Sequence, residues 1–532
     1  MKHKLLTLAM TILMAGSLAA CGKSAAHSGK TLNVTLPDEP ATVDPNTAYD
    51  TNSASLITQT MEGLYKYDKN NRIVAGVATK VVKPTNDGKT YTFKLRKNAK
   101  WSNGQPVTAN DFVTSFRRTV NPKTKAQFAS VYDCFKNFDA VQAGKMSPDK
   151  LGVKALNSRT LQIQLTRAVP YFNDLVTNKY LPINSKAVSK YGKQFGTSST
   201  KSVYDGPYKL VGWSGSNSSW HYVKNPYYWN AHNVKIPKVN VTVTKEQNTA
   251  VNLFKSGKIQ VTSVTGQYVR ENKNDPEMHT HLTGRENYLY FNNKKPQTDS
   301  ENLRQAISAV INRKELVNNV LQDGSKQMLS AVPEGDQKDP ANGKDMAKEV
   351  GNLLPQNVAK AKQYWNAYLK EVGKKQVTLN LLTDDTDQDK HTGEYIQSVA
   401  QKNLKGLKVT MTSIPHAQHV SRDFAGNFEM NLTGWSTNWL DASDFLGLGT
   451  STNQVNFTHL KNAKFDSLMN QSNHLSGQAR YNKLVQADKY FTAFKGYVPL
   501  YQPAQANLIS KHVGGLKYSL LNDAQYQYAY WK

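Results

Sequence analysis

Hydrophobic and polar residues alternate along several short segments of the chain, a pattern that predicts β-strands. In the segment TYTFKLR, residues 90–96, the side chains of Tyr91, Phe93 and Leu95 share one face, and the NDG sequence before it is typical of a tight turn. The same alternation occurs in TLQIQL at residues 160–165 and in VNVTV at residues 239–243. Each segment is expected to bury one face.

Two further strands are predicted on either side of a helix. The segments VTLNLL, residues 377–382, and LKVTM, residues 407–411, have the composition of strands, and residues 394–404 between them have a helical pattern. This strand–helix–strand order favours a parallel or mixed α/β sheet.

The most regular helical pattern covers residues 298–324. Thr298 and Glu301 have the spacing of a capping box, and Gly324 suits the C-terminal end of a helix. We therefore predict one long helix here. Its apolar stripe consists of Leu303, Ala306, Ile307, Val310 and Ile311.

The N-terminus has the pattern of a secretory signal. Lys2 and Lys4 precede an uncharged apolar run, residues 5–20, which is shorter than the roughly 20 residues that span a bilayer. A plain cleaved signal with an incidental cysteine is one interpretation. The sequence LAAC at residues 18–21 resembles the bacterial lipobox, in which the cysteine is acylated, and this favours a lipoprotein. Residues 1–20 are then the signal, Cys21 is the lipidation site, and residues 21–30 form a flexible tether.

The cysteine content predicts no disulfide framework. Cys134 is the one cysteine besides Cys21, and it lies in no CxxC or Cys/His spacing that would bind a metal. We expect Cys134 to be a buried structural thiol.

Length and charge bound the class of protein. A chain of 532 residues exceeds what one hydrophobic core usually holds, so two or three domains are expected. The formal net charge is +27, which in a secreted protein indicates anionic cell-wall polymers or lipid headgroups as partners, and no nucleic acid. The alternative is lysines spread over every face, and the lack of a dense basic block favours it slightly.

Signatures of enzymes are largely missing from the sequence. The GKT at residues 88–90 is no phosphate-binding loop, because Lys83 stands where the first glycine of that motif belongs. The histidine pairs 279/281 and 416/419 have no evident third ligand. Neither a cofactor nor a metal is predicted, and a hydrolase remains only a minor alternative.

An unusual segment, LTGWSTNWLDASDFLG at residues 432–447, sets two tryptophans among small polar residues. Trp435 and Trp439 have the i, i+4 spacing of a helix and could be core residues. However, Gly434 and the Ser-Thr-Asn run at residues 436–438 make a poor helix start, which favours a loop that lines a pocket.

Several segments, taken together and in order, resemble the bacterial extracellular solute-binding proteins of family 5, the oligopeptide-binding receptors of ABC importers. The resemblance covers nearly the whole chain after the tether. The segments are ATVDPNTAYDTNSASLITQTMEGLYKYD, DGKTYTFKLRKNAKWSNGQPVTANDFVTSFRR, GPYKLVGW, NPYYWN, YLYFNNKKP, LRQAISAVINRKELV and VPLYQPA.

The resemblance implies a two-lobed, type II periplasmic-binding-protein-like α/β fold with an additional α/β domain and hinge closure over the ligand. One lobe would comprise residues 31–61, 184–286 and 504–532, the additional domain residues 62–183, and the other lobe residues 287–503. It also implies a lipid-anchored monomer on the outer face of the cell membrane, which captures oligopeptides and delivers them to the permease subunits of an ABC importer. A basic adhesion protein that reuses the fold is the alternative.

The family resemblance also assigns ligand-binding residues. The tryptophan that packs on a ligand side chain corresponds to Trp435, and the backbone contacts correspond to Ser436 and Thr437. The family's ammonium-binding aspartate falls on Asn438, and an arginine that can meet the peptide carboxylate is replaced by Leu432. Both charged anchors are therefore missing or moved. Either Asp441 or Asp444 has taken over the first, or the natural ligand presents no free amine at this position, and the second alternative is slightly favoured. The remaining assigned residues are Trp439, Tyr49, Thr51, Phe128, Tyr290 and His416.

Overall fold

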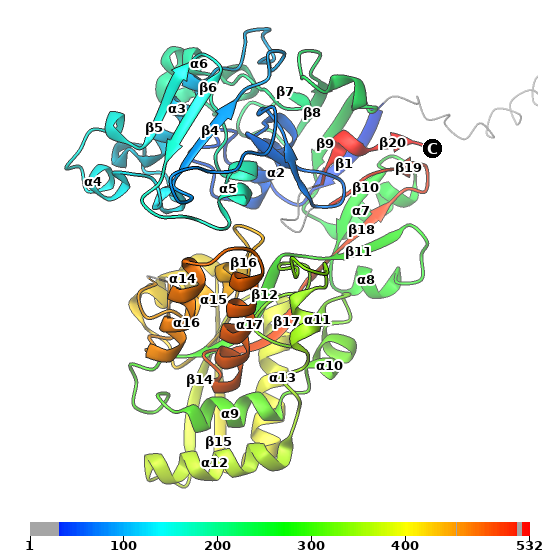
Figure 1. Ribbon diagram of the computed structural model, residues 1–532. Helices are drawn as coiled ribbons and strands as arrows, with labels where there is room; N and C mark the ends of the chain where they lie inside the picture. The colour runs from blue at the N-terminus through cyan, green and yellow to red at the C-terminus, as the bar shows by residue number, and fades with distance from the viewer. Residues whose placement is uncertain (1–30, 454, 519–523) are drawn as a thin grey trace, which may run out of the picture.

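Two large mixed β-sheets form the cores of two lobes, which lie one above the other in Figure 1. The structure is a computed structural model that describes residues 31–453, 455–518 and 524–532. The predicted signal, the tether and Cys21 lie outside the described residues.

The upper lobe contains a seven-stranded sheet built from three separate parts of the chain. The central strand β1 is parallel to both of its neighbours, and the other neighbouring strands pair antiparallel. In spatial order the strands are β11 (Met278–Leu282), β18 (Ala504–Ile509), β10 (Val261–Val264), β1 (Thr31–Leu36), β9 (Lys238–Val243), β8 (Ser219–Lys224) and β7 (Tyr208–Val211). The associated helices are α7 (Gln247–Lys255) and α8 (Gln267–Glu271).

A three-stranded antiparallel sheet lies beside it, within the region predicted as the additional domain. Its buried side chains, among them Phe93 and Phe112, join the same apolar cluster as Trp213 and Val239 of the seven-stranded sheet. The region therefore packs as an extension of the upper lobe. Its elements are β2 (Tyr65–Tyr67), β3 (Ile73–Ala75), β4 (Thr90–Lys94), β5 (Val153–Asn157), β6 (Thr160–Gln164), α3 (Ala109–Val120), α4 (Phe138–Gln142) and α5 (Phe172–Asn178). The first-lobe helices α2 (Thr51–Thr60) and α6 (Ser185–Tyr191) flank it in the chain.

The predicted strands β4 and β6 of this region are confirmed, as is β9 of the seven-stranded sheet, and Tyr91, Phe93 and Leu95 are all buried. Cys134 is buried and unpaired, as expected, and burial raises the pKa of its thiol to about 12. The thiol is therefore protonated and behaves as an apolar core group.

The lower lobe contains a six-stranded sheet in which β14, α13 and β15 form the predicted parallel strand–helix–strand unit. In spatial order the strands are β13 (Lys326–Gln327), β17 (Val498–Gln502), β12 (Arg285–Phe291), β16 (Met430–Ser436), β14 (Val377–Asp384) and β15 (Leu407–Ile414). The helices are α9 (Glu301–Val310), α10 (Arg313–Glu315), α11 (Met346–Val350), α12 (Val358–Val372), α13 (Asp387–Asn403), α14 (His416–Ala425), α15 (Ser443–Leu446), α16 (Ala463–Asn473) and α17 (Gly477–Phe494).

The prediction of one helix over residues 298–324 is wrong in extent. Helix α9 is capped by Ser300, which accepts a hydrogen bond from the Leu303 amide at 3.2 Å. The chain turns extended at Ile311, and Asn312 then caps α10 by accepting from the Glu315 amide at 3.0 Å. A π-helix, Leu316–Leu321, follows. The Asn312 side chain satisfies a backbone donor at the break, so a new helix start replaces the continuous ladder.

Two adjacent segments connect the lobes. The chain leaves β11 at Leu282 and enters β12 at Arg285, and it returns from β17 to β18 through Pro503. The Thr283 amide donates to the Pro503 carbonyl at 3.0 Å, which ties the two crossings together. The lower sheet thus begins at Arg285, two residues before the predicted start of that lobe at residue 287. A pair of short crossings is the geometry of a hinge.

Candidate functional site

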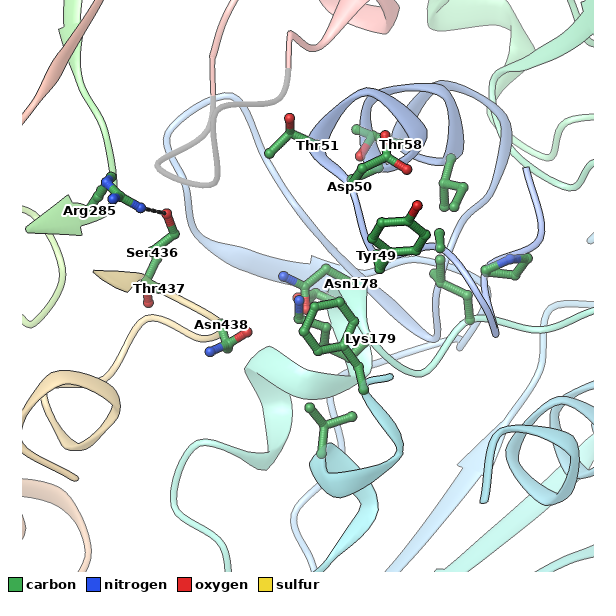
Figure 2. Close-up of a pocket in the computed structure, with 18 of the residues that line it drawn as sticks. Tyr49, Asp50, Thr51, Thr58, Asn178, Lys179, Arg285, Ser436, Thr437 and Asn438 are labelled. Atoms are coloured by element: carbon green, nitrogen blue, oxygen red, sulfur yellow. Dashed lines mark hydrogen bonds between the residues drawn. The ribbon is translucent and has the colours of Figure 1, made fainter. Parts of the chain in front are cut away.

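A cavity of about 640 Å³ lies between the two lobes, which is in the size range of ligand pockets. Its upper wall comes from α2 and from the segments around residues 45–51, 61–67, 128–132 and 177–181. Its lower wall comes from the starts of β12 and α14 and from the end of β16. Figure 2 shows Tyr49, Asp50 and Thr51 on one side and Arg285, Ser436 and Asn438 on the other. Because both lobes contribute walls, the shape of the cavity depends on the orientation of one lobe relative to the other.

Eight of the eleven ligand-binding residues predicted from the sequence line this cavity. The structure brings them together from segments that are far apart in the chain, and their contact with a ligand stays a prediction. The eight residues are Tyr49, Thr51, Phe128, His416, Trp435, Ser436, Thr437 and Asn438.

Three predicted residues do not line the cavity. Tyr290 is 1% exposed, because Phe428 packs edge-on against its ring at 5.2 Å between centroids. Trp439 stacks on Tyr171 of the upper lobe at 4.5 Å. Asp441 forms an ion pair of 2.7 Å with Arg480. The first is a core residue, the second an inter-lobe contact, and the third a buried salt bridge.

Trp435 lies in strand β16 and Trp439 in the turn that follows, so the helical interpretation of the two residues is wrong. The predicted loop begins only after Ser436, and of the two tryptophans Trp435 lines the cavity whereas Trp439 does not. Asp444 organises the turn. Its carboxylate accepts hydrogen bonds from the Asn438 amide, from Thr437 Oγ1 at 3.2 Å and from Trp435 Nε1 at 3.3 Å. Burial raises the pKa of Asp444 to about 6.

Neither nearby carboxylate faces the cavity, because each is committed to partners within the lower lobe. Asp441 accepts from the Ser443 amide at 2.9 Å in addition to Arg480, and Asp444 is occupied by the turn. Both are absent from the cavity lining. The structure therefore does not support a transfer of the ammonium anchor from position 438 to Asp441 or Asp444.

Sequence reasoning missed several polar residues of the wall. Arg285 is the first residue of β12, directly after a crossing between the lobes. Its position next to a crossing was the one feature of the sequence that could have indicated a place in the cavity wall. Asn178 ends α5 and Lys179 follows it, and the Lys179 ammonium lies 5.4 Å from the centre of the Phe128 ring. Thr58 and Asp423 also line the cavity.

Helix α14 is fastened to the sheet by a histidine–carboxylate cluster. Asp384 Oδ2 is 2.8 Å from His416 Nδ1, and Asp384 Oδ1 is 2.6 Å from His419 Nδ1. Burial works to lower the pKa of His419, but the hydrogen bond to Asp384 and the charge of Asp423 bring it above its ordinary value. His419 is thus a buried structural group, whereas His416 is exposed at the cavity rim.

Residues 31–453, 455–518 and 524–532 contain neither a membrane-spanning helix nor a cluster of metal-binding side chains. No helix in this part is long and apolar enough to cross a membrane. No group of three or more His, Cys, Asp or Glu side chains in the same residues is arranged to hold a metal ion.

Comparisons with known proteins match along nearly the whole chain. The family described as bacterial extracellular solute-binding proteins, family 5 Middle, matches residues 72–457. A dipeptide-binding protein of Lactococcus lactis subsp. cremoris is 31% identical over 479 residues, which cover 87% of this chain and 86% of the relative.

Two solved structures share the fold. The structure of Listeria monocytogenes OppA bound to peptide has a TM-score of 0.78 and 33% identity, and the match covers 95% of this chain and 99% of that one. The substrate-binding domain of an oligopeptide ABC transporter from Bacillus anthracis has a TM-score of 0.78 and 34% identity, with 95% and 99% covered. These likenesses confirm the predicted two-lobed α/β fold.

Proposed function

Because the chain belongs to the bacterial extracellular solute-binding proteins of family 5, we propose that it is a receptor that captures oligopeptides outside the cell and delivers them to an ABC importer. The observation that carries the proposal is the cavity walled by both lobes at the two crossings. A ligand held there contacts both walls at once, so binding favours the closed arrangement that a transporter can recognise.

The chemistry of the cavity supports a peptide as the ligand. Aromatic side chains such as Phe128 and Trp435 offer broad apolar contact, and the end of β16 offers backbone groups beside Ser436 and Thr437. Backbone pairing gives affinity that does not depend on sequence, and apolar walls tolerate different side chains. The named relatives bind peptides, which agrees with this chemistry.

The proposal extends to location and organisation. The protein is a monomer anchored through Cys21 to the outer face of the cell membrane and has no catalytic role. Residues 62–183 form an appendage of the first lobe, which itself comprises residues 31–61, 184–284 and 504–532. Anchoring has a direct test, since Cys21→Ser should release the protein into the medium or leave an uncleaved precursor. Membrane fractionation and processing at residue 21 that are both unchanged would contradict the anchor.

Native mass spectrometry of freshly purified protein tests the central proposal. We expect masses above that of the bare chain, and peptides among the molecules that denaturation releases. The formal charge of +27 favours a second outcome, an adhesion protein with an empty cavity and salt-sensitive binding to cell-wall polymers. An empty cavity from which no peptide is recovered, together with such binding to cell-wall polymers, would overturn the proposal that the protein is a peptide receptor.

A further inference from the structure

We propose that Arg285 forms a carboxylate-binding subsite in the lower wall, so that the ligand places an anionic group against the segment of residues 434–438. This inference rests on the proposed function and specifies the charge of the ligand at one end of the cavity. The anionic group is a carboxylate, supplied by the C-terminus of a peptide or by an acidic side chain.

The guanidinium of Arg285 is held in a fixed position. Its Nε donates to Asn287 Oδ1 at 3.0 Å, and its Nη1 donates to Ser436 Oγ at 3.3 Å. Gly434 provides the space, because a Cβ at that position would lie 2.5 Å from Arg285 Nη2. Figure 2 shows the Arg285 side chain reaching from its strand towards Ser436. A pre-oriented planar fork suits carboxylate recognition.

The positive charge of Arg285 is not balanced within the protein. Both of its side-chain hydrogen bonds go to neutral groups, and Arg285 takes part in no ion pair among the described residues. The neighbouring Glu286 is buried and accepts a hydrogen bond from the Tyr497 hydroxyl, and burial raises its pKa well above its usual range. The charge of Arg285 works to lower the pKa of Asp389 against the effect of burial, but the two side chains form no ion pair. A half-buried cation without a counter-ion favours an anionic ligand.

The lower wall around Arg285 also offers no carboxylate for an ammonium group. Position 438 is an asparagine, and Asp441 and Asp444 are occupied inside the lobe. Two of the cavity's acids lie in the upper wall: Asp50 caps α2, and Glu62 is paired with Lys66 at 3.1 Å. Asp423 of α14 lies in the lower wall but is bonded to Asn431, and burial raises its pKa to about 6.

The experiment uses two random peptide libraries that differ only at the C-terminus, one with a free carboxylate and one amidated. Affinity selection followed by mass spectrometry identifies a bound peptide, and calorimetry then measures this peptide and its amide. We expect wild-type protein to bind the carboxylate form at least tenfold more tightly. Arg285→Gln should reduce the ratio to within about twofold.

Two further variants make the test specific. Arg422→Gln removes an equal charge from an exposed position of α14 outside the cavity lining and should keep the wild-type ratio. Gly434→Ala keeps the net charge, but its Cβ would meet Arg285 Nη2, Asn287 Oδ1 and the Glu286 carbonyl, so the guanidinium and the adjoining strand must both shift and the ratio should fall. Thermal unfolding of each variant establishes that the lobes remain folded.

The source of the carboxylate is resolved by doubly capped peptides that contain one glutamate or one glutamine. A preference for glutamate that disappears in Arg285→Gln assigns the subsite to an acidic side chain, and a preference confined to the free C-terminus assigns it to the terminus. Equal binding of all forms by wild type and Arg285→Gln would overturn the subsite while leaving the receptor intact. Retention of neither library by wild type would overturn the receptor itself.

Discussion

Asn438 is positioned by a carboxylate that the cavity does not expose. Its amide N–H donates to Asp444, and its side-chain Nδ2 lies 3.4 Å from Asp444 Oδ1. Asp444 is buried beneath the turn and does not line the cavity. The side chain that the segment exposes to the cavity at this point is therefore the neutral Asn438. Arg285, which donates to Ser436, is therefore the charged side chain beside this segment as long as position 438 stays neutral, and Asp423 of α14 is the acid of the same wall.

The substitution Asn438→Asp tests this balance. A carboxylate at the cavity wall should strengthen binding of free-amine peptides by about 1–3 kcal/mol, because a charge-assisted hydrogen bond replaces a neutral one. It should weaken ligands that place a carboxylate beside Arg285. Calorimetry at pH 7.5 with a peptide and its N-acetylated twin measures the difference. An equal gain for both twins would mean that position 438 does not meet the amine.

At the residue scale, the sequence predicts types of side chain better than their partners. The small polar run at residues 436–438 correctly indicated a cavity loop. Asp441 was assigned to the ligand, but its partner Arg480 lies 39 residues further along the chain, and no local pattern reveals such a pair. Arg285 was missed for the same reason, since its place depends on Gly434 and Ser436 of a neighbouring strand.

Helix α5 and the turn after β16 meet across the boundary between the lobes. Tyr171 and Trp439 stack with an interplanar angle of 8°, and the Trp439 ring packs against the upper-lobe core. Neither ring lines the cavity. The stack therefore affects how the two lobes are held together and does not touch the ligand. It is an inter-lobe latch formed by two aromatic rings.

Trp439→Ala should weaken ligand binding although Trp439 does not line the cavity. Loss of an aromatic pair costs about 0.5–1.5 kcal/mol beyond the lost burial, so the dissociation constant should rise roughly tenfold through faster release. Tyr171→Phe keeps the stacked ring and serves as the matched control, with affinity near wild type. Surface plasmon resonance resolves the release rate. An unchanged rate in Trp439→Ala would show that the stack does not hold the lobes together.

At the element scale, periodicity identified the strands and the βαβ unit but misjudged the helix at residues 298–324. The apolar stripe does continue past Val310 into Ile311. Asn312 caps the next short helix, and the buried Arg313 that follows donates to the Pro499 carbonyl at 2.6 Å and to Ser308 Oγ at 3.0 Å. The Asn312 cap is a local signal that the continuous apolar stripe concealed, whereas the contacts of Arg313 are tertiary and no local pattern reveals them.

A movement of one lobe relative to the other must occur at the two crossings that connect them. The upper and lower sheets share no strand, and the connections at residues 283–284 and 503 are the two routes of the chain between them. The cavity could not be located from sequence alone, because its walls come from residues as distant as Tyr49 and Asn438. The prediction that these distant residues meet came from the resemblance to the family, because the alternation of polar and apolar residues carries no information on contacts between distant segments.

A ligand that bridges the lobes should compact and stabilise the protein. A ligand that binds only the folded state stabilises it by RT ln(1 + [L]/Kd), which is about 2.7 kcal/mol at a concentration of 100 Kd. Small-angle scattering should show a smaller radius of gyration with a selected peptide, and the melting temperature should rise together with it. A rise in melting temperature without compaction would mean that the hinge does not close on binding.

Proton uptake should accompany closure, because Asp174 lies at the same inter-lobe contact as the latch. Burial is the main reason that the pKa of Asp174 is raised, to about 7, and the charge of Asp441 in the lower lobe adds to this. Tyr67 donates to Asp174 at 2.8 Å, and the Leu440 amide of the lower lobe also bonds to it. Separation of the lobes returns water to this carboxyl group and should bring its pKa back towards 3.8.

The sign of the effect follows from that difference. The closed form binds the proton more tightly, so closure is favoured fully below pH 4 and loses this advantage as the pH rises towards 7. Asp336 and Asp444 also have raised pKa values, and both accept from Thr437 within the lower lobe, but the charge of Asp174 contributes to the shift of Asp336. The protonation of Asp444 should therefore change little with closure, whereas that of Asp336 is coupled to Asp174.

Ligand affinity should consequently fall between pH 5 and 7, by at most tenfold per pH unit. Calorimetry at pH 5.5 in two buffers of different ionisation enthalpy should reveal the uptake of about one proton per peptide bound. Asp174→Asn should remove most of this uptake, and Asp139→Asn, at an exposed position of α4, should leave it unchanged. Equal uptake by wild type and Asp174→Asn would assign the proton to another group, and His419 beside Asp384 would be the next to test.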